Sequence, residues 1–237
     1  MYVVDSVSKS YKHHHALTPL TFTATSGECI VLCGGNGAGK STLLSLLSGS
    51  ASLSSGQIRL DDISLEKNRH QYLQRVSFMP DDFHAQGYLK VKEFLSFYAK
   101  IRKISKERVE EVLHIVGLKD KQDVLVHQLS KGMKQRLLLG QALLPKSNVI
   151  LLDEPTNGLD PYWITRFIEI IQQIKREGSI VIFSTHMMDV AAELASRVLF
   201  LDSGHVVKVV KNTYKHHQDF TLDLLKWHRE AKIVQEG

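Results

Sequence analysis

The chain has 237 residues, which is enough for one large domain with a well-buried core. Hydrophobic residues make up 43% of it and charged residues 23%, so the composition excludes a disordered or fibrous chain. Thirty lysines and arginines against 25 acidic residues give a formal net charge of +5, a surplus compatible with a nucleic acid, an anionic membrane surface or a phosphate ligand.

Two features of the composition bear on where the chain works. Its apolar runs, such as residues 149–152, are far shorter than the roughly 20 residues of a membrane-spanning helix, and its first residues lack the apolar stretch of a secretory signal. We therefore expect a soluble chain, for which any membrane role must come through a partner. Its two cysteines, Cys29 and Cys33, lie in an apolar run and are expected to be reduced core residues of a cytosolic protein.

In chain order, the first third alternates strand-like and turn-like segments, with one helical segment at residues 41–49. Apolar residues then recur at helical spacing between about residues 90 and 144, which predicts a helical insert. Beyond this insert, short apolar runs alternate with helical segments at residues 161–175 and 187–195. This order predicts an α/β fold with a parallel sheet and buried central strands. Residues 205–237 show no motif, and we expect a short basic C-terminal tail there.

A glycine-rich loop lies between a predicted strand at residues 29–33 and the first predicted helix. It fits the pattern G-x-x-x-x-G-K-[ST] through Gly34, Gly35, Asn36, Gly37, Ala38, Gly39, Lys40 and Ser41. Glycines let backbone amides turn towards phosphate oxygens, the helix N-terminus adds its dipole, the Lys40 ammonium adds a charge, and the Ser41 hydroxyl can bind Mg²⁺. A turn that merely caps the helix is the alternative, but the full pattern rarely arises by chance. The loop therefore predicts a nucleotide site.

Two carboxylates follow the apolar run of residues 149–152. Open α/β sheets bind their ligands at the carboxyl ends of the strands, so Asp153 and Glu154 are expected at that edge. Neighbouring residues of a strand point in opposite directions. We expect Asp153 to serve Mg²⁺ and Glu154 to reach a water molecule in line with a γ-phosphate. His186 follows another predicted strand and is expected at a similar edge, although a lone histidine is more often structural.

These motifs occur in a characteristic order together with residues 129–137 (LSKGMKQRL) and residues 157–160 (NGLD). Over residues 2 to about 205, the chain resembles the ATP-binding cassette subunit of an ABC transporter. The resemblance implies the P-loop NTPase fold of such a cassette in a single domain: a RecA-like parallel-sheet core, an antiparallel β subdomain and a helical subdomain at about residues 88–145. It also implies ATP and Mg²⁺ as cofactors, and ATP hydrolysis coupled to transport.

The resemblance assigns roles to single residues. The nucleotide-binding residues are Tyr11, Gly34, Gly35, Asn36, Gly37, Ala38, Gly39, Lys40, Ser41, Thr42, Ser130 and Gly132; the metal-binding residues are Ser41, Asp81 and Asp153; the catalytic residues are Lys40, Glu154 and His186. Glu154 resembles the general base, and His186 the histidine that contacts the γ-phosphate. Asp160 resembles the aspartate that links the two sites of a dimer. Tyr11 resembles the aromatic residue that stacks on adenine; alternatively, it is a strand-end aromatic that packs on the core.

The segment around Ser130 is predicted to form a second phosphate site. Ser130 is placed to cap a helix, and the amide of Gly132 lies in the first turn, so that free N–H groups face an anion. The resemblance adds a partner to this site. Two copies of the chain are expected to close head to tail, so that Ser130 and Gly132 contact the γ-phosphate held by the partner's Lys40.

Three positions depart from the pattern of the family. Asp81 occupies the place of a glutamine after the predicted strand at residues 75–80, and it can still approach Mg²⁺, though as a charge rather than a dipole. Lys131 and Met133 replace a glycine and a glutamine in the segment of Ser130. These departures resemble exporter-type cassettes that pair with separate six-helix permeases, including those of antibiotic export and of nitrous oxide reductase maturation.

The implied partners are a separate transmembrane permease subunit and a second copy of the chain, at the cytoplasmic face of the inner membrane; no nucleic acid is expected. Residues 81–88 and the start of the helical insert are expected to form the groove that grips the permease. An alternative is a soluble cassette that acts on nucleic acid in translation or repair, which the net charge favours and the single phosphate loop disfavours. A generic P-loop kinase or GTPase leaves residues 129–136 and 157–160 unexplained.

Histidines are clustered at His13, His14 and His15, and again at His216 and His217. No cysteine or acid stands at ligand spacing beside them. We therefore favour a surface turn for the first cluster and a place in the tail for the second over a metal site.

Overall fold

The computed structural model of the protein describes residues 1–12, 14–81 and 88–233. Its smaller sheet is antiparallel, with the strand order β2-β1-β4-β5. Its strands are β1 (Tyr2–Tyr11), β2 (His14–Ala24), β4 (Ser55–Leu60) and β5 (Ile63–Ser64). Along β1, Tyr2 and Val4 are fully buried, whereas Val3 and Asp5, which alternate with them, are half-buried. One face of this sheet therefore covers a core.

The larger sheet has six strands, in the order β10-β9-β3-β8-β7-β6. They are β3 (Cys29–Cys33), β6 (Val76–Met79), β7 (Val149–Leu152), β8 (Ile180–Ser184), β9 (Arg197–Asp202) and β10 (His205–Lys211). All neighbours in it run parallel except β10, which pairs antiparallel with β9. Every residue of β3, β7 and β8 is buried, which explains why these strands read as uninterrupted apolar runs. The predicted parallel sheet with buried central strands is confirmed.

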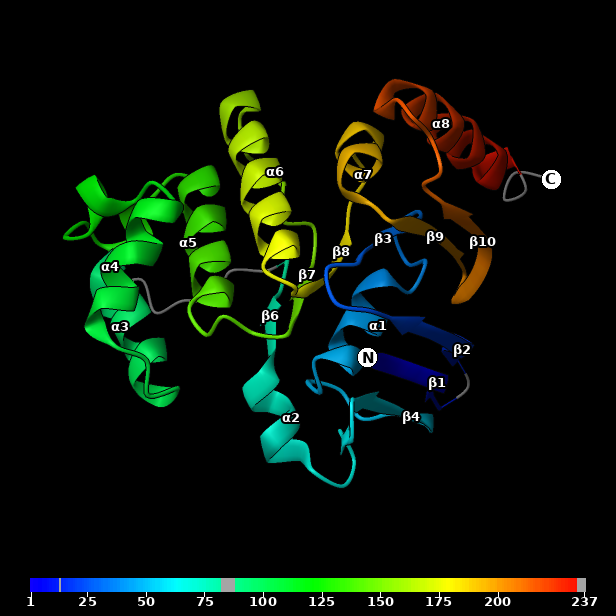
Figure 1. Cartoon of the computed structure of the whole chain (residues 1–237), viewed down its shortest axis with the longest axis horizontal. Coiled ribbons are helices and arrows are strands. Elements are labelled where there is room, and N and C mark those ends of the chain that lie inside the picture. The colour runs from blue at the N-terminus through cyan, green and yellow to red at the C-terminus, as the bar shows by residue number, and fades with distance from the viewer. Residues whose placement is uncertain (13, 82–87, 234–237) are drawn as a thin grey trace.

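Helix α1 (Lys40–Leu47) lies between the two sheets (Figure 1). Its leucines are fully buried and pack in one core with apolar residues of both sheets. Because α1 directly follows the glycine-rich loop, the packing that forms this core also positions the loop. A second helix, α2 (Arg69–Arg75), was not expected from the sequence, since Tyr72 is its one buried residue. The Tyr72 hydroxyl donates to Leu47 O at 2.6 Å, at the end of α1.

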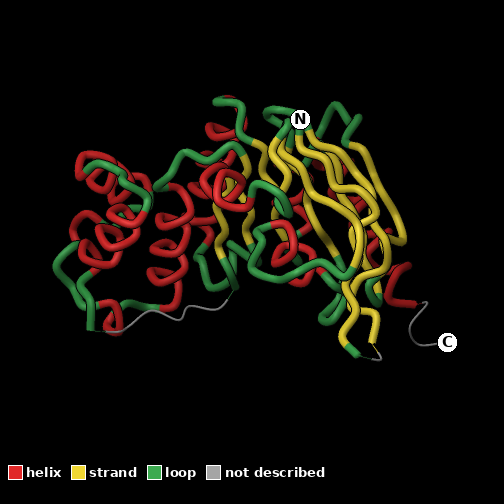
Figure 2. The backbone as a smooth tube through the Cα atoms, turned by 90° about the horizontal axis from the view of Figure 1, so that it is seen from below, coloured by secondary structure: helices red, strands yellow, loops and turns green. Residues whose placement is uncertain are grey.

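The helical insert contains three helices, α3 (Val91–Ile101), α4 (Lys106–Ile115) and α5 (Lys131–Leu143), and 3₁₀ turns at Lys119–Lys121 and Val126–Gln128. These helices lie to one side of the strands (Figure 2). Side-chain oxygens of Ser105 and Ser130 cap α4 and α5. The apolar residues of α3, α4 and α5 belong to a second core, which is separate from the core that contains α1. Within residues 1–12, 14–81 and 88–233, every helix is too short or too polar to span a bilayer.

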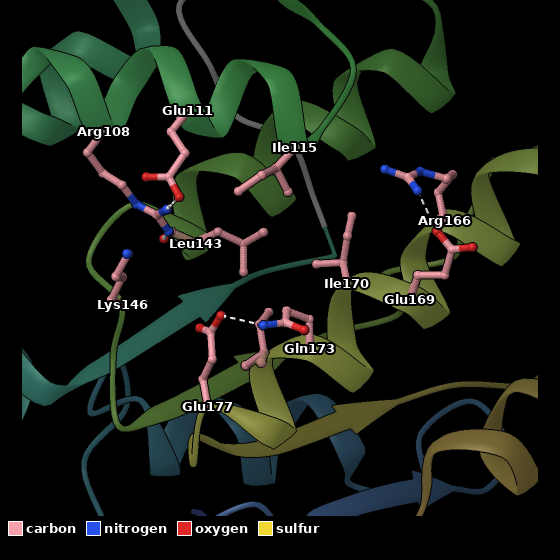
Figure 3. Close-up of a pocket in the computed structure, with 11 residues that line it drawn as sticks. Arg108, Glu111, Ile115, Leu143, Lys146, Arg166, Glu169, Ile170, Gln173 and Glu177 are labelled. Carbon is pink, nitrogen blue, oxygen red and sulfur yellow. Dashed lines mark hydrogen bonds and ion pairs between the residues drawn. The ribbon is translucent and has the colours of Figure 1, made fainter.

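A groove of about 290 Å³ separates the insert from α6 (Pro161–Arg176) (Figure 3). Charged side chains line it together with apolar ones, among them Ile115 of the insert and Ile170 of α6. The ion pairs drawn in Figure 3 stay within one helix, as Arg108 does with Glu111 on α4. Among the described residues, no ion pair joins the insert to α6.

The C-terminal segment, for which we expected a short basic tail, contains a strand and a helix. The last two helices are α7 (Met188–Leu194) and α8 (His217–Ile233). The segment forms β10 at the edge of the sheet and then α8, which packs against α7 (Figure 1). Phe220 and Leu224 are fully buried, and Trp227 packs beside them. These residues recur at i, i+4 and i+7, a helical face that the many lysines and histidines around it obscured in the sequence.

Two further expectations concern histidines and cysteines. The first histidine run was expected in a surface turn, but β2 begins at His14 and includes His15. The Nδ1 atom of His15 lies 2.9 Å from Ser10 Oγ. His13 lies outside the described residues. Cys29 and Cys33 are free and buried in β3, and burial raises the pKa of both thiols to about 12. Both therefore stay protonated thiols near neutral pH.

Gly117, just after α4, lies where three helices meet. Its φ of +60° is left-handed, and the ring of Trp163 from α6 is so close that a Cβ on Gly117 would lie 2.3 Å from Cη2. The guanidinium of Arg136 from α5 covers the same ring, 3.9 Å from its centroid. The contact thus joins α4, α5 and α6.

We predict that Gly117→Ala lowers the free energy of unfolding by about 2–4 kcal/mol, because the Trp163 ring must move and the backbone is strained. Melting followed by circular dichroism would then show a Tm lower by about 5–15 °C. Gly35→Ala is the matched control, because a Cβ there meets nothing within 4 Å. Equal losses of stability in the two variants would contradict the importance of the Trp163 contact.

Candidate functional site

Four strands of the larger sheet end at one edge and carry the candidate residues. The glycine-rich loop follows β3, Asp81 follows β6, Asp153 and Glu154 follow β7, and His186 follows β8. Because these strands are parallel neighbours, the segments after them meet. They surround a cavity of about 390 Å³, which is lined by Gly35, Asn36, Gly37, Ala38, Gly39, Lys40, Ser41, Thr42, Asp81, Glu154, Asn157 and His186.

The glycine-rich loop is shaped to hold an anion. Gly39, with a φ of +101°, occupies the N-cap position of α1, and no side chain caps the helix there. The amides of the first turn border the cavity and lack the side-chain acceptor that a capping residue would supply. At the start of the loop, a Cβ on Gly34 would lie 2.2 Å from Leu201 O, so only glycine fits.

Lys40 is buried beside the loop. Its ammonium donates to Gly34 O at 2.8 Å and to Gly35 O at 3.1 Å, and it lies 3.8 Å from Glu154 Oε1. A buried charge requires such partners. Two of the three partners are neutral carbonyls, so much of the positive potential remains for an anion in the cavity.

The two acids after β7 make different contacts. Asp153 Oδ1 accepts from the Ser184 hydroxyl at 2.6 Å, whereas Glu154 Oε1 lies 3.1 Å from His186 Nε2. Glu154 has a φ of +44°, a left-handed conformation that costs an L-residue about 1–2 kcal/mol. Its Oε1 is buried and makes no hydrogen bond of good geometry with the other described residues. This atom can therefore accept a hydrogen bond from a molecule in the cavity.

Burial raises the pKa of the Glu154 carboxyl to about 7. The Lys40 ammonium opposes this rise, while the negative charges of Asp153 and Asp81 add to it. A carboxyl whose pKa lies near neutral pH can both take up and release a proton, which is the property of a general base.

Asp81, the acid in the glutamine position, reaches the same cavity. Its Oδ1 accepts a hydrogen bond from Asn157 Nδ2 at 3.0 Å, and both residues line the cavity. This contact ties the end of β6 to the segment after β7. Most of the expected permease groove, residues 82–87, lies outside the described residues.

Tyr11 stands apart from the cavity. It ends β1, it is 53% exposed, and the Lys9 ammonium lies 4.7 Å from its ring centroid. The alternative that Tyr11 packs on the core is wrong, because a residue so exposed belongs to neither core. Its stacking on adenine stays a prediction.

Ser130 forms the predicted N-cap of α5, since its Oγ accepts from the amide three residues later at 3.2 Å. A Cβ on Gly132 would lie 2.7 Å from Gly158 O, so the close approach of the two segments requires glycine. Neither Ser130 nor Gly132 lines the cavity of its own chain. Asp160 caps α6 by accepting from Trp163 N at 2.9 Å. The contacts of all three candidate residues with a second copy stay predictions.

Sequence analysis missed three polar residues of this region: Gln135, Asn157 and Ser184. Gln135 Nε2 donates to Glu154 O at 2.9 Å, and Ser184 Oγ accepts from Glu154 N at 2.8 Å. Gln135 and Ser184 are both buried, and Ser184 ends the apolar run of β8. For Ser184 the polar residue at the end of an apolar run was the available signal, because a buried polar side chain requires a hydrogen-bond partner. Gln135 lies between two basic residues and gave no such signal.

A nucleotide and a magnesium ion fit the residues that are present. The uncapped start of α1 and the Lys40 ammonium suit phosphate oxygens. Glu154 Oε1, which lacks a hydrogen bond of good geometry among the described residues, suits a water molecule. Ser41, Asp81 and Asp153 supply the oxygen atoms that Mg²⁺ prefers. In the described part of the chain, no three His, Cys, Asp or Glu side chains gather around one point. Mg²⁺ bound beside phosphates needs only one or two carboxylates.

A family model described as ABC transporter matches residues 17–157, more than half of the chain. The chain belongs to the ABC transporter family. It is an ATP-binding subunit of that family and an ATPase, as the order of its motifs predicted.

Three relatives from Bacillus subtilis illustrate the range of the family. The chain is 34% identical over 210 residues to the uncharacterized ABC transporter ATP-binding protein YxlF, a match that covers 87% of this chain and 69% of YxlF. It is 30% identical to the linearmycin resistance ATP-binding protein LnrL, with 90% and 70% covered. It is 31% identical to the arginine transport ATP-binding protein ArtM, with 88% and 90% covered.

Solved structures of ABC cassettes share the fold. The ATP-binding subunit of an ABC transporter matches with a TM-score of 0.83 at 24% identity, over 95% of this chain and 99% of the other. A dimeric bacterial ABC transporter cassette gives a TM-score of 0.83 at 24% identity, over 90% of this chain and 100% of the other. The predicted ABC cassette fold is confirmed.

Proposed function

We propose that the chain is the ATPase subunit of an ABC exporter, which binds ATP and Mg²⁺ between two head-to-tail copies and drives a separate transmembrane permease. The observation that carries this proposal is the convergence of Lys40, Glu154 and His186 on the cavity beside the glycine-rich loop. An ammonium and an imidazole beside a buried carboxylate suit the attack of water on a phosphoanhydride.

Groups of the chain hold the nucleotide before it reacts. The amides at the start of α1 and the Lys40 ammonium bind the phosphates, and Lys40 exchanges its loop carbonyls for phosphate oxygens. Ser41, Asp81 and Asp153 hold Mg²⁺, which supplies charge neutralisation at the phosphates when bound. Tyr11 stacks on the adenine.

Glu154 then accepts a proton from the attacking water, while His186 orients this water and contacts the γ-phosphate. An O–P bond forms to the water oxygen as the bond to the β–γ bridging oxygen breaks, and ADP takes the leaving electron pair. Ser130 and Gly132 of a second copy close the cavity and exclude bulk water, and Asp160 links the two sites. Opening of the dimer after hydrolysis resets the permease.

Export is the direction that the sequence favours. Asp81 in place of glutamine, with Lys131 and Met133, resembles exporter-type cassettes, including those of nitrous oxide reductase maturation. The names of the relatives point both ways, since LnrL is named for linearmycin resistance and ArtM for arginine transport. The proposal therefore rests on the three departures, and it locates the chain at the cytoplasmic face of the inner membrane as a peripheral subunit.

Inside-out vesicles test the proposed direction. They are prepared from cells that overproduce the chain with the membrane protein that copurifies with it, and their solutes are measured by mass spectrometry. We expect added ATP to raise the amount of at least one solute inside the vesicles, and vesicles with Glu154→Gln to show no rise. An ATP-dependent loss of solute from the lumen would mean import. Copurification of RNA in place of a membrane protein would support the nucleic-acid alternative.

A further inference from the structure

The backbone of Glu154 is held on both sides by buried side chains. Its N–H donates to Ser184 Oγ at 2.8 Å, and its carbonyl accepts from Gln135 Nε2 at 2.9 Å. Ser184 is fully buried, and Gln135 is 6% exposed. Two side chains from separate elements, β8 and α5, thus converge on one residue of the candidate site.

The residue held in this way has a strained backbone, with a φ of +44°. A residue other than glycine keeps such a conformation only when its surroundings enforce it. A change in φ or ψ of Glu154 would turn its amide and carbonyl relative to each other and break at least one of the two hydrogen bonds. The bonds to Ser184 and Gln135 therefore maintain the conformation that directs the carboxylate into the cavity.

Ser184 also connects Glu154 to the acid before it. Its hydroxyl accepts from Glu154 N–H and donates its single proton to Asp153 Oδ1 at 2.6 Å. Donation in that direction leaves a lone pair of the hydroxyl for the amide of Glu154. One side chain thus holds both acids of the site.

Gln135 connects Glu154 to the helix that carries the second phosphate motif. Gln135 lies on α5, five residues after Ser130, the N-cap of that helix. A rigid helix transmits a displacement along its length, so a shift of α5 moves Ser130 and the donor to Glu154 together. The base and the motif expected to meet a second copy are therefore mechanically linked within one chain.

We propose that Gln135 and Ser184 are positioning residues for the general base. They keep Glu154 Oε1 3.1 Å from His186 Nε2 and 3.8 Å from Lys40 Nζ, and Gln135 makes this placement depend on the position of α5. The inference rests on the proposed function, in which Glu154 is the base. A cassette in which α5 has shifted keeps its contacts with the nucleotide but loses the aligned carboxylate.

Gln135→Met tests this inference in the purified full chain, because methionine keeps the length of glutamine and lacks the donor. We expect the kcat for ATP hydrolysis to fall at least about tenfold while KM changes less than about threefold. The assay is run at a temperature at which melting curves show the variant folded. Gln141→Met, half-buried on the same helix, is the matched control and is expected to keep the unchanged kcat.

Combination with Glu154→Gln separates positioning from a general structural role. If Gln135 acts through Glu154, Gln135→Met has no further effect on the residual turnover of Glu154→Gln, measured with radiolabelled ATP. If the two losses of turnover multiplied in the double variant, the inference would be overturned. A kcat of Gln135→Met alone within about twofold of the unchanged protein would overturn it as well. In both cases the base assignment would stand. Near-normal turnover of Glu154→Gln would overturn the base assignment and this inference together.

Discussion

Glu154→Gln is expected to lower steady-state ATP turnover by at least about 100-fold, while ATP binding stays within about threefold of the unchanged protein. Glutamine keeps the size of glutamate but cannot take up the proton of the attacking water. Because binding uses Lys40 and the amides of α1, the nucleotide stays bound and a dimer with two ATP molecules accumulates. Phosphate release measures the turnover, and size-exclusion chromatography with ATP measures the dimer.

Glu193→Gln is the matched control for this substitution. Glu193 is exposed on α7, away from the cavity lining, so its loss is expected to leave turnover within about twofold. If Glu154→Gln hydrolysed ATP at a near-normal rate, another group would have to be the base. The raised pKa of Glu154 would then reflect burial without a catalytic role.

Ser130→Arg is expected to abolish turnover although Ser130 does not line the cavity of its own chain. The long cationic side chain would occupy the space in which the second copy closes over its nucleotide. Loss of the N-cap alone costs about 1 kcal/mol. Ser130→Ala is therefore the matched control: it loses the same cap without the added bulk, and its Tm separates lost stability from blocked closure.

Mixing two inactive variants decides whether the site is shared between copies. In a mixed dimer of Ser130→Arg and Lys40→Ala, a head-to-tail arrangement leaves one site with both an intact Lys40 and an intact Ser130. We expect turnover to reappear on mixing. If dimers shown to be mixed recovered no turnover, the composite site would be contradicted. Full activity in mixed dimers of Ser130→Arg with the unchanged chain would contradict it as well.

Some strands and helices could be predicted from the sequence, because they are buried on both faces or because their buried residues recur at a regular spacing. β3, β7 and β8 lie in the middle of a covered parallel sheet, so their sequences are continuously apolar. α2 and α8 were missed for the opposite reason. α2 has a single buried residue, Tyr72, and the apolar face of α8 is spread thinly among charged and histidine residues. α2 therefore has no apolar stripe, and the stripe of α8 is hidden among polar residues, so that contact with the rest of the fold is needed to recognise either helix.

Some parts of the candidate site could likewise be predicted from the sequence, and others could not. The glycine-rich loop and the two acids after β7 were placed correctly, since each motif is local and parallel strands bring their carboxyl ends to one edge. The expected positions of Tyr11 and of the tail depended on contacts that no local pattern records. The structure removed the core-packing alternative for Tyr11 and showed a strand and a helix in the basic C-terminal segment.

By itself, the sequence determined the fold class, the anion-binding loop and the identity of the acids, because these depend on local periodicity and on residue types at short spacing. Only the tertiary structure decided how the acids are held. The bonds from Gln135 and Ser184 to Glu154, and from Asn157 to Asp81, join residues 19, 30 and 76 positions apart. A hydrogen bond between distant segments exists only where packing brings its donor and acceptor within about 3 Å, and no pattern within one segment specifies that distance.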